Sequence, residues 1–201
     1  MKRKLKFGLT IVLGIALVAV SIGYAFFQPF VPGAVYDAIP AQATFVHRTD
    51  TLDELLESPV CGQLDKALGA GNTLATLAAA SPWLRRVVPS EIAVADLPLR
   101  RSGQTRSWAA ASWVGWRSPW LRWRLEHTRT EGFSRLKKHN VWPVWKYEVP
   151  GIADGTPLVF ALTDNLFIAC LSDTPSDIFP LLDAYDNRIL SANDLKQRRN
   201  P

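Results

Sequence analysis

The feature that most constrains this chain is a run of 21 residues without a charged side chain, from Phe7 to Phe27. A helix rises about 1.5 Å per residue, so this run is long enough to cross a hydrocarbon core of about 30 Å. Lys and Arg crowd the six residues before it, which favours a cytoplasmic N-terminus. Pro29 and Pro32 would end the helix. We therefore expect a transmembrane signal-anchor helix over residues 7–27, after a cytoplasmic basic end at residues 1–6.

A cleaved secretory signal peptide is the alternative interpretation of the same run. Gly23-Tyr24-Ala25 offers a small-x-small cleavage site, although the bulky Phe26 and Phe27 continue the apolar run beyond it. Both interpretations export the rest of the chain. We favour the uncleaved anchor, which would hold the protein in the membrane as a single-pass protein.

The pattern of apolar residues and turns after the anchor predicts one domain. Residues 28–42 read as an extended stalk, residues 43–187 as an exported domain, and residues 188–201 as a loose polar tail. Thr51, followed by Glu54 three residues later, predicts a capped helix start. Strands are expected at 44–48, 91–97, 107–114, 141–149, 158–162 and 166–171, and further helices at 120–127, 133–138 and 176–185.

Hairpins dominate this order of elements, and no regular strand-helix-strand repeat is present. The fold class that we expect is therefore α+β, with a mainly antiparallel sheet and helices packed on one face of it. Ser118-Pro119 is the expected cap of the helix at 120–127.

Charge is unevenly distributed along the chain, whose formal net charge is +5. Four basic residues lie in the first six positions, so the rest of the chain is nearly neutral and gives no reason to expect nucleic-acid binding. Residues 85–146 nevertheless hold 13 basic residues against 4 acidic ones, together with seven of the eight tryptophans. Interleaved Trp and Arg are typical of contact surfaces, both with protein partners and at the headgroup level of membranes.

We predict that this middle region divides its tryptophans between the core and a contact patch. Trp108, Trp113 and Trp142 lie in expected strands and should be buried. The candidate contact patch surrounds the Ser118-Pro119 turn and comprises Trp116, Arg117, Trp120, Arg122, Trp123 and Arg124. Its partner would be an envelope protein or an anionic lipid. The competing interpretation places the indoles in the core, with arginine stems lying over them.

Catalytic chemistry has little support in the sequence. It contains no Gly-x-Ser-x-Gly, HExxH, P-loop or dinucleotide-binding glycine pattern, so we assign no catalytic, cofactor-binding or metal-binding residue. The alternative to a binding domain is a secreted or anchored hydrolase whose site is assembled from scattered residues such as His47, Asp50 and Asp164. Cys61 and Cys170 are the two cysteines, and we expect them to be buried thiols rather than a disulfide, although export would permit the bond.

Short motifs at both ends of the expected domain resemble a group of bacterial membrane-anchored envelope proteins of unknown function. The chain has Ile39-Pro40-Ala41-Gln42-Ala43 leading into its first strand, a helix that ends near Ser58-Pro59, and the phrase Ser172-Asp173-Thr174-Pro175 after the last hairpin. The resemblance is structural and identifies no functional residue. It implies an N-terminal module in the bacterial inner membrane, with the domain in the periplasm or outside the cell.

Overall fold

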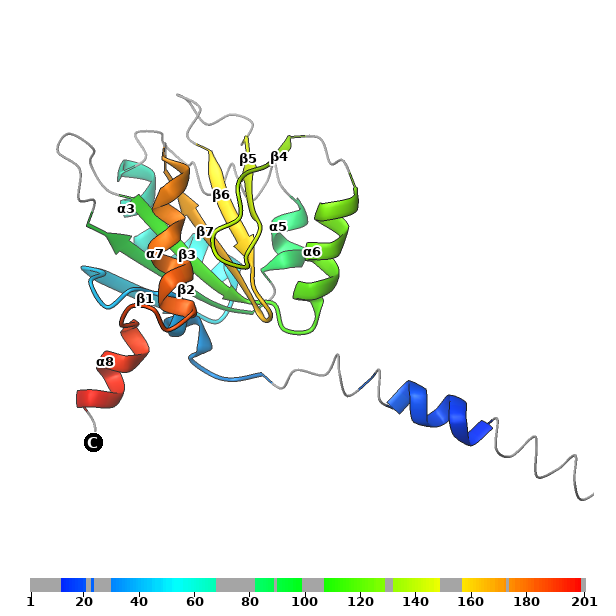
Figure 1. The fold of residues 1–201 in the computed structure, drawn as a ribbon. Helices are drawn as coiled ribbons and strands as arrows, with labels where there is room; N and C mark the ends of the chain where they lie inside the picture. Colours follow the sequence, from blue (N-terminus) through cyan, green and yellow to red (C-terminus); the bar gives the residue numbers. More distant parts are fainter. Residues whose placement is uncertain are drawn as a thin grey trace, which may run out of the picture. The chain divides into compact units, whose positions relative to one another are not determined.

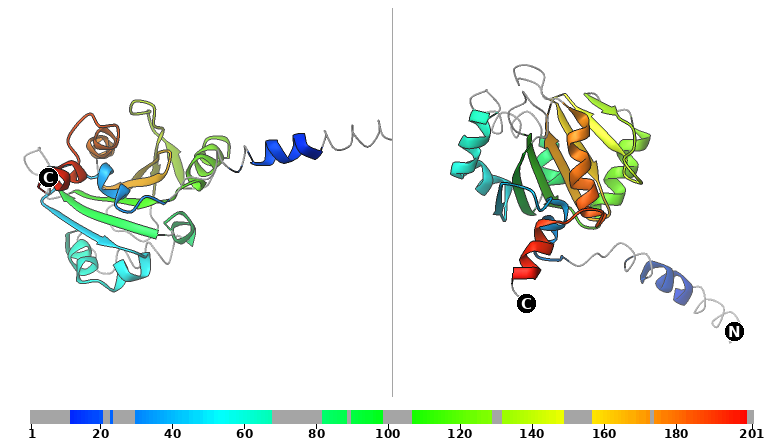
Figure 2. Two further views of the ribbon diagram at one scale, coloured as in Figure 1. Left: turned by 90° about the horizontal axis from the view of Figure 1, so that it is seen from below. Right: turned by 60° about the vertical axis from the view of Figure 1, so that its left-hand side comes forward.

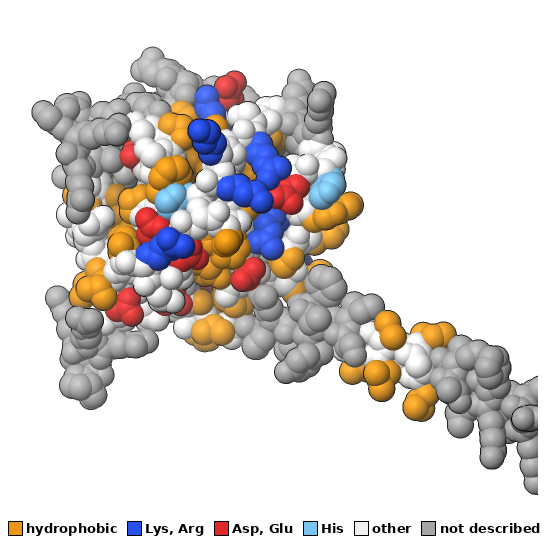
Figure 3. All heavy atoms as spheres, in the orientation of Figure 1, with side chains coloured by type: hydrophobic (Ala, Val, Ile, Leu, Met, Phe, Trp, Pro, Cys, Tyr) orange, Lys and Arg blue, Asp and Glu red, His pale blue; other side chains and the backbone are white. Residues whose placement is uncertain are grey.

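The computed structural model describes residues 12–20, 23, 30–67, 82–88, 90–98, 107–128, 132–148, 157–172 and 174–199. The chain divides into two compact units, Met1–Phe30 and Val31–Pro201. In the first unit, residues 12–20 are helical and their side chains are exposed (Figure 3). Within the described residues, no helix reaches the length and apolarity needed to cross a membrane. About half of the expected span at 7–27 lies outside those residues, and the span stays a prediction.

The second unit contains helices and strands in mixed order (Figure 1). Its strands are β1 (Phe45–Thr49), β2 (Ser90–Leu97), β3 (Ser107–Trp113), β4 (Phe133–Arg135), β5 (Val144–Tyr147), β6 (Leu158–Leu162) and β7 (Leu166–Leu171). Its helices are η1 (Ala34–Ala38), α2 (Leu52–Glu57), α3 (Pro59–Ala67), α5 (Pro82–Val87), α6 (Arg117–His127), η3 (Pro175–Ile178), α7 (Phe179–Tyr185) and α8 (Ala192–Arg199).

A seven-stranded sheet in the order β1-β2-β3-β7-β6-β5-β4 forms the centre of this unit, and every neighbouring pair is antiparallel. The α+β class with an antiparallel sheet is therefore confirmed. Both expected hairpins are present, β2 with β3 and β6 with β7. The last strand returns to the middle of the sheet beside β3, so the order cannot be read from the chain alone.

Helices cover both faces of the sheet, which corrects the prediction that they pack on one face (Figure 2). On β7, Phe167 packs into a cluster with Leu55 of α2 and Leu84 of α5, whereas Ile168 packs into a second cluster with Leu181 of α7. Strands buried on both faces lose the alternation of apolar and polar residues. The uninterrupted apolar sequences of β6 and β7 are this signal.

The expected stalk at residues 28–42 is wrong for its described part, because its residues form helix η1 and enter the core. Val35, Ala38 and Ile39 are fully buried and pack in the cluster on the α7 face. The backbone N–H of Gly33 donates to the Glu91 carboxylate on β2, with 2.7 Å between N and Oε1. The domain therefore begins near Val31.

The expected loose tail at residues 188–201 is also wrong for its described part. Residues 192–199 form α8, and Ser191 caps this helix through hydrogen bonds with Asp194. The N–H of Ala192 donates to the carbonyl of Ile39 at 2.7 Å, and the N–H of Ala41 donates to the carbonyl of Leu190 at 2.8 Å. These bonds fix the segment to the start of the domain, which short-range sequence patterns do not reveal.

Two local predictions had opposite outcomes. Thr51 caps α2 as expected, since its hydroxyl accepts the N–H of Glu54 at 3.1 Å and the Glu54 carboxylate accepts the N–H of Asp50 at 2.9 Å. The helix expected at 133–138 is instead strand β4, which pairs with β5. Phe133 packs against the hydrophobic core, and this contact favours pairing of the short segment with the sheet.

Candidate binding groove between helices α5 and α6

A tight turn after β3 positions the helix that carries the expected contact patch. Gly115 has a positive φ of 61°, where other residues are strained. The N–H groups of Val114 and Gly115 both donate to the carbonyl of Asn165, at 2.8 and 2.9 Å. The chain then enters α6 at Arg117, earlier than the expected start at 120. Ser118 therefore lies in the first turn of α6 rather than at its cap.

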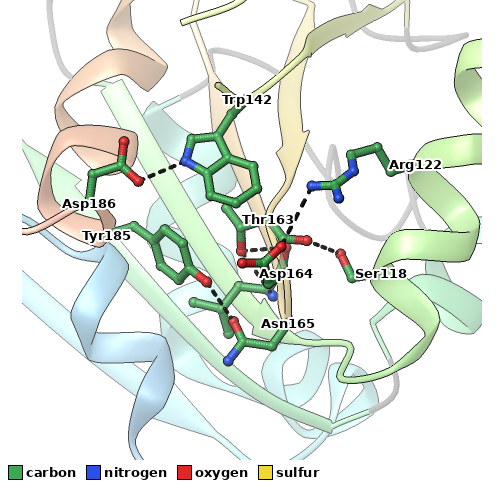
Figure 4. Close-up of polar contacts among 9 residues, drawn as sticks. Ser118, Arg122, Trp142, Thr163, Asp164, Asn165, Tyr185 and Asp186 are labelled. Carbon is green, nitrogen blue, oxygen red and sulfur yellow. Dashed lines mark hydrogen bonds and ion pairs between the residues drawn. The ribbon is translucent and has the colours of Figure 1, made fainter. Parts of the chain in front are cut away.

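Helix α6 is held against the turn between β6 and β7 (Figure 4). The buried hydroxyl of Ser118 donates to the carbonyl of Thr163, and Arg122 forms an ion pair with Asp164 at 3.8 Å. On the other side of the same turn, the Tyr185 hydroxyl donates to the Asn165 side chain at 3.1 Å. The turn thus fixes α6 to the sheet while α7 holds it from the opposite side.

The predicted burial of three tryptophans and exposure of the others in the candidate patch are confirmed. Trp108, Trp113 and Trp142 are buried. Trp116 and Trp120 are 52% and 50% exposed, and the neighbouring Trp123 is 57% exposed. Trp116 and Trp120 both line one groove and form an exposed apolar surface of a kind that a monomer rarely leaves without a use.

Helix α6 distributes the six residues of the expected contact patch over different directions. Arg117, Trp120 and Arg124 lie on one face and line a groove, together with Trp116. Arg122 points the other way and lies over the Trp142 ring, with 5.5 Å from its guanidinium carbon to the ring centroid. Trp123 stacks on His127, with ring centroids 5.0 Å apart. Four residues of the patch region, Trp116, Arg117, Trp120 and Arg124, therefore line the groove, whereas Arg122 and Trp123 do not. Figure 3 shows basic and apolar side chains side by side on the face where α6 borders β4 and β5.

The groove runs between α5 and α6 and encloses about 890 Å³. That volume falls within the range of small-molecule binding sites. Strand residues form its floor and α5 forms its second wall. Its lining comprises Trp83, Arg85 and Val87 of α5, Trp116, Arg117, Trp120, Leu121, Arg124 and Leu125 of α6 and its preceding turn, and Phe133, Phe160, Leu162 and Phe167 of the sheet.

An aromatic cluster makes the floor of the groove rigid. The Phe160 ring is 1% exposed and packs against Trp83, Phe133 and Phe167, with centroid distances of 5.8, 5.9 and 5.4 Å. Trp145 stacks on the same ring at 5.7 Å. Aromatic contacts at such distances are favourable beyond their area. The floor is thus preformed by the core.

The α5 wall was missed by our sequence reasoning, although a signal for it is present. Residues 81–85 and residues 118–122 both read Ser-Pro-Trp-Leu-Arg. The second copy lies within the predicted contact patch, and the first copy supplies Trp83 on the facing wall of the groove. In the structure Trp83 and Trp120 both line the groove, whereas Arg85 faces it and Arg122 does not. The repeated motif could have led to the second helix.

A second polar cluster, also missed from sequence, joins the loop before β5 to α7. His139 Nε2 lies 2.8 Å from the Asp183 carboxylate, and the His139 ring stacks on Phe179 at 4.1 Å. The Trp142 indole N–H donates to the Asp186 carboxylate at 2.8 Å (Figure 4). These bonds attach the loop before β5 to α7, so the cluster has a structural role in holding these two elements together.

The scattered residues of the hydrolase hypothesis are not brought into contact. His47 lies on β1, and Asp164 lies in the turn between β6 and β7, with β2 and β3 between β1 and β7. Neighbouring strands are about 4.8 Å apart, so this offset is on the order of 14 Å. Asp50 pairs with Arg48 at 3.6 Å, and Asp164 pairs with Arg122. No described group of three or more His, Cys, Asp or Glu residues is arranged to hold a metal ion.

Cys61 and Cys170 are buried thiols, as expected. Burial, reinforced by the nearby Asp177 carboxylate, raises the pKa of Cys170 to about 12, and its hydrogen bond with Ser107 lowers it only in part. The reactive thiolate is therefore scarce at neutral pH.

We expect Cys170 in the native protein to resist alkylation by iodoacetamide at pH 8 and to react once the chain is unfolded in urea. Peptide mass spectrometry measures the modification, and the unfolded sample is the positive control. Modification of native Cys170 at the rate of a free small thiol would contradict the buried environment.

The raised pKa of Cys170 also predicts that the free energy of unfolding falls as pH rises from about 9 to 12, because the thiol of the unfolded chain loses its proton at a lower pH than the thiol of the folded chain.

Comparison of the chain with protein-family models, characterised proteins and solved structures finds no match.

Proposed function

We propose that the chain is a single-pass membrane protein with an exported, non-catalytic domain that binds another component of the cell envelope. The observation that carries this proposal is the pair of half-exposed indoles, Trp116 and Trp120, at the edge of a preformed groove. Trp and Arg are the residues that most often dominate binding energy.

The membrane anchor is supported by the sequence. The uncharged run from Phe7 to Phe27 is preceded by four basic residues, and this charge bias favours a cytoplasmic N-terminus with the domain on the other side of the membrane. The folded unit begins at Val31, four residues after the last residue of that run. The resemblance around Ile39-Pro40-Ala41 leads us to propose the bacterial inner membrane as the location, with the domain in the periplasm or outside the cell.

Protease protection combined with site-specific photocrosslinking tests this function. The full chain is expressed in bacterial cells with p-benzoylphenylalanine at position 120, or at Ile189, an exposed apolar residue of the domain that lines no part of the groove. We expect external protease to digest the domain in spheroplasts. Ultraviolet light should yield a discrete adduct with an envelope component from position 120 and not from position 189.

A domain that is protected in spheroplasts and digested only after lysis would contradict the proposed topology. Identical adducts from both positions would contradict the assignment of the groove as the contact site. A catalytic role would instead be indicated by turnover in an activity screen that is lost in His47→Ala.

A further inference from the structure

The groove between α5 and α6 differs in chemistry between its floor and its rim. The floor and the inner parts of both walls carry only apolar side chains: Phe133, Phe160, Leu162 and Phe167 of the sheet, Val87 of α5, and Leu121 and Leu125 of α6. None of them can form a hydrogen bond with a ligand. On the α5 wall, the indole N–H of Trp83 is buried and has no acceptor among the described residues, and the polar side chain that this wall contributes is Arg85 at the rim. A ligand segment that lies on this floor must itself lack polar groups.

The rim of the groove is positively charged. Arg117 and Arg124 are two helical turns apart on the same face of α6, which corresponds to roughly 10 Å along the axis. Each guanidinium lies beside an exposed indole, Arg117 over Trp116 at 5.8 Å and Arg124 over Trp120 at 5.5 Å. In the part of the chain that the structure describes, neither arginine forms an ion pair with a carboxylate.

The other charges around the rim do not cancel this pair. Arg85 on the facing wall adds a third positive charge, which Asp53 balances at 3.1 Å. Glu126 pairs with Arg135 at 3.4 Å and belongs to the opposite face of α6. Among the described residues, no carboxylate pairs with Arg117 or Arg124, so the groove presents two guanidinium groups above an apolar floor.

We infer that the groove binds one anionic phospholipid, with an acyl chain on the apolar floor and the phosphate at Arg117 and Arg124. Guanidinium groups match phosphate oxygens in geometry and charge. Trp116 and Trp120 lie between floor and rim, where indoles suit the boundary between acyl chain and headgroup. The inference rests on the proposed function, because it needs a domain held beside a membrane.

A peptide fits the same groove less well. Its backbone carries an N–H and a C=O in almost every residue, and each needs a partner when it is removed from water. The floor supplies no polar side chain to meet them, and the backbone of its central strands is already paired within the sheet. An acyl chain has no such requirement, and this difference favours the lipid.

Quenching of tryptophan fluorescence by brominated lipids tests the inference on the full chain. All eight tryptophans lie between Trp83 and Trp145, so the anchor contributes no signal. The protein is reconstituted in phosphatidylcholine vesicles that carry an increasing fraction of acyl-brominated phosphatidylglycerol or acyl-brominated phosphatidylcholine. We expect half-maximal quenching at roughly fivefold less of the anionic lipid, the ratio expected for two exposed ion pairs.

The double variant Arg117→Gln/Arg124→Gln should lose this preference. The matched control Arg188→Gln/Lys196→Gln removes the same charge from residues that do not line the groove and should keep it. Equal quenching of the wild-type protein by both lipids would overturn the inference, because the rim would then not select charge. Absence of quenching with either lipid would also overturn it and would leave a protein as the occupant. The proposed function is contradicted separately, by protease protection of the domain in spheroplasts.

Discussion

Replacing Phe160 by alanine is expected to lower the free energy of unfolding by about 3–5 kcal/mol, the range for large aromatic side chains removed from a core. Phe160 is 1% exposed and lies at the centre of the aromatic cluster, in contact with rings from α5, β4, β5 and β7. The loss combines the transfer of the ring to water with the cavity that remains. Because Trp83 packs on this ring, the α5 wall of the groove should loosen as well.

Urea unfolding of the full chain in phosphatidylcholine vesicles, followed by tryptophan fluorescence, measures this effect. Phe160→Leu keeps most of the apolar volume and should cost markedly less. Ile189→Ala, at a position that is 38% exposed, serves as the surface control and should change stability by less than about 0.5 kcal/mol. A loss in Phe160→Ala no larger than that of the surface control would mean that the floor of the groove is not part of the folded core.

Arg48→Met is the second substitution from which we expect a large effect, a loss of about 2–3 kcal/mol. The carboxylate of Glu91 is 1% exposed and lies 3.0 Å from the Arg48 guanidinium, on a backbone with a positive φ of 41°. Removing one partner leaves the other charge buried, which costs about 3–5 kcal/mol in a fully buried pair. We expect less here because the Arg48 side chain is 38% exposed and solvent reaches the pair.

A double variant separates the cost of leaving the Glu91 charge buried without a partner from the cost of lost packing. Adding Glu91→Gln to Arg48→Met removes the buried charge and keeps an acceptor for the Gly33 N–H, so stability should partly recover in urea unfolding. Arg188→Met is the matched control, since Arg188 lies 3.8 Å from Asp186 on an exposed side chain and should cost little. No recovery in the double variant would show that the destabilisation came from packing alone.

The parts of the fold that follow from short-range patterns could be predicted from the sequence. Residues 158–162 and 166–171 were expected as a hairpin and are β6 and β7, because apolar runs on either side of Thr163-Asp164-Asn165 leave few alternatives. The helix cap at Thr51 depends on Glu54, only three residues later, and could also be predicted from the sequence. What pairs with β3, however, is β7, more than 50 residues later, and no local pattern specifies that contact.

Expectations failed where a distant partner decides the local structure. Residues 34–38 looked like a stalk because they precede the first strand and follow prolines, yet their burial depends on Glu91 and on α7. Residues 192–199 looked like a tail because they are polar, and their attachment depends on Ile39. Both segments become ordered only through long-range contacts, which composition does not encode.

The candidate site was predicted in part. The exposure of Trp116 and Trp120 followed from their position beside a Ser-Pro turn between a strand and a helix. The sequence did not predict that Arg122 and Trp123 point away from the groove. Their directions depend on the start of α6 at Arg117, which the Gly115 turn and the Ser118 hydrogen bond determine. The concave shape required a second wall from α5, and its distance from α6 in sequence concealed it.

The pairing of residues 39–41 with residues 190–192 has a consequence for how the domain matures. The chain leaves the ribosome from its N-terminus, so the first segment of the domain must wait until more than 140 residues have followed before its hydrogen-bond partners exist. During that interval Val35 and Ile39 stay exposed to solvent or to whatever holds the nascent chain. If the domain is exported as we propose, export before completion would meet an unfolded chain, and closure of the domain would follow late, on the far side of the membrane. In a protein tethered as we propose, this late closure keeps the chain unfolded, and therefore able to pass through the membrane, until its last strand and helix have crossed.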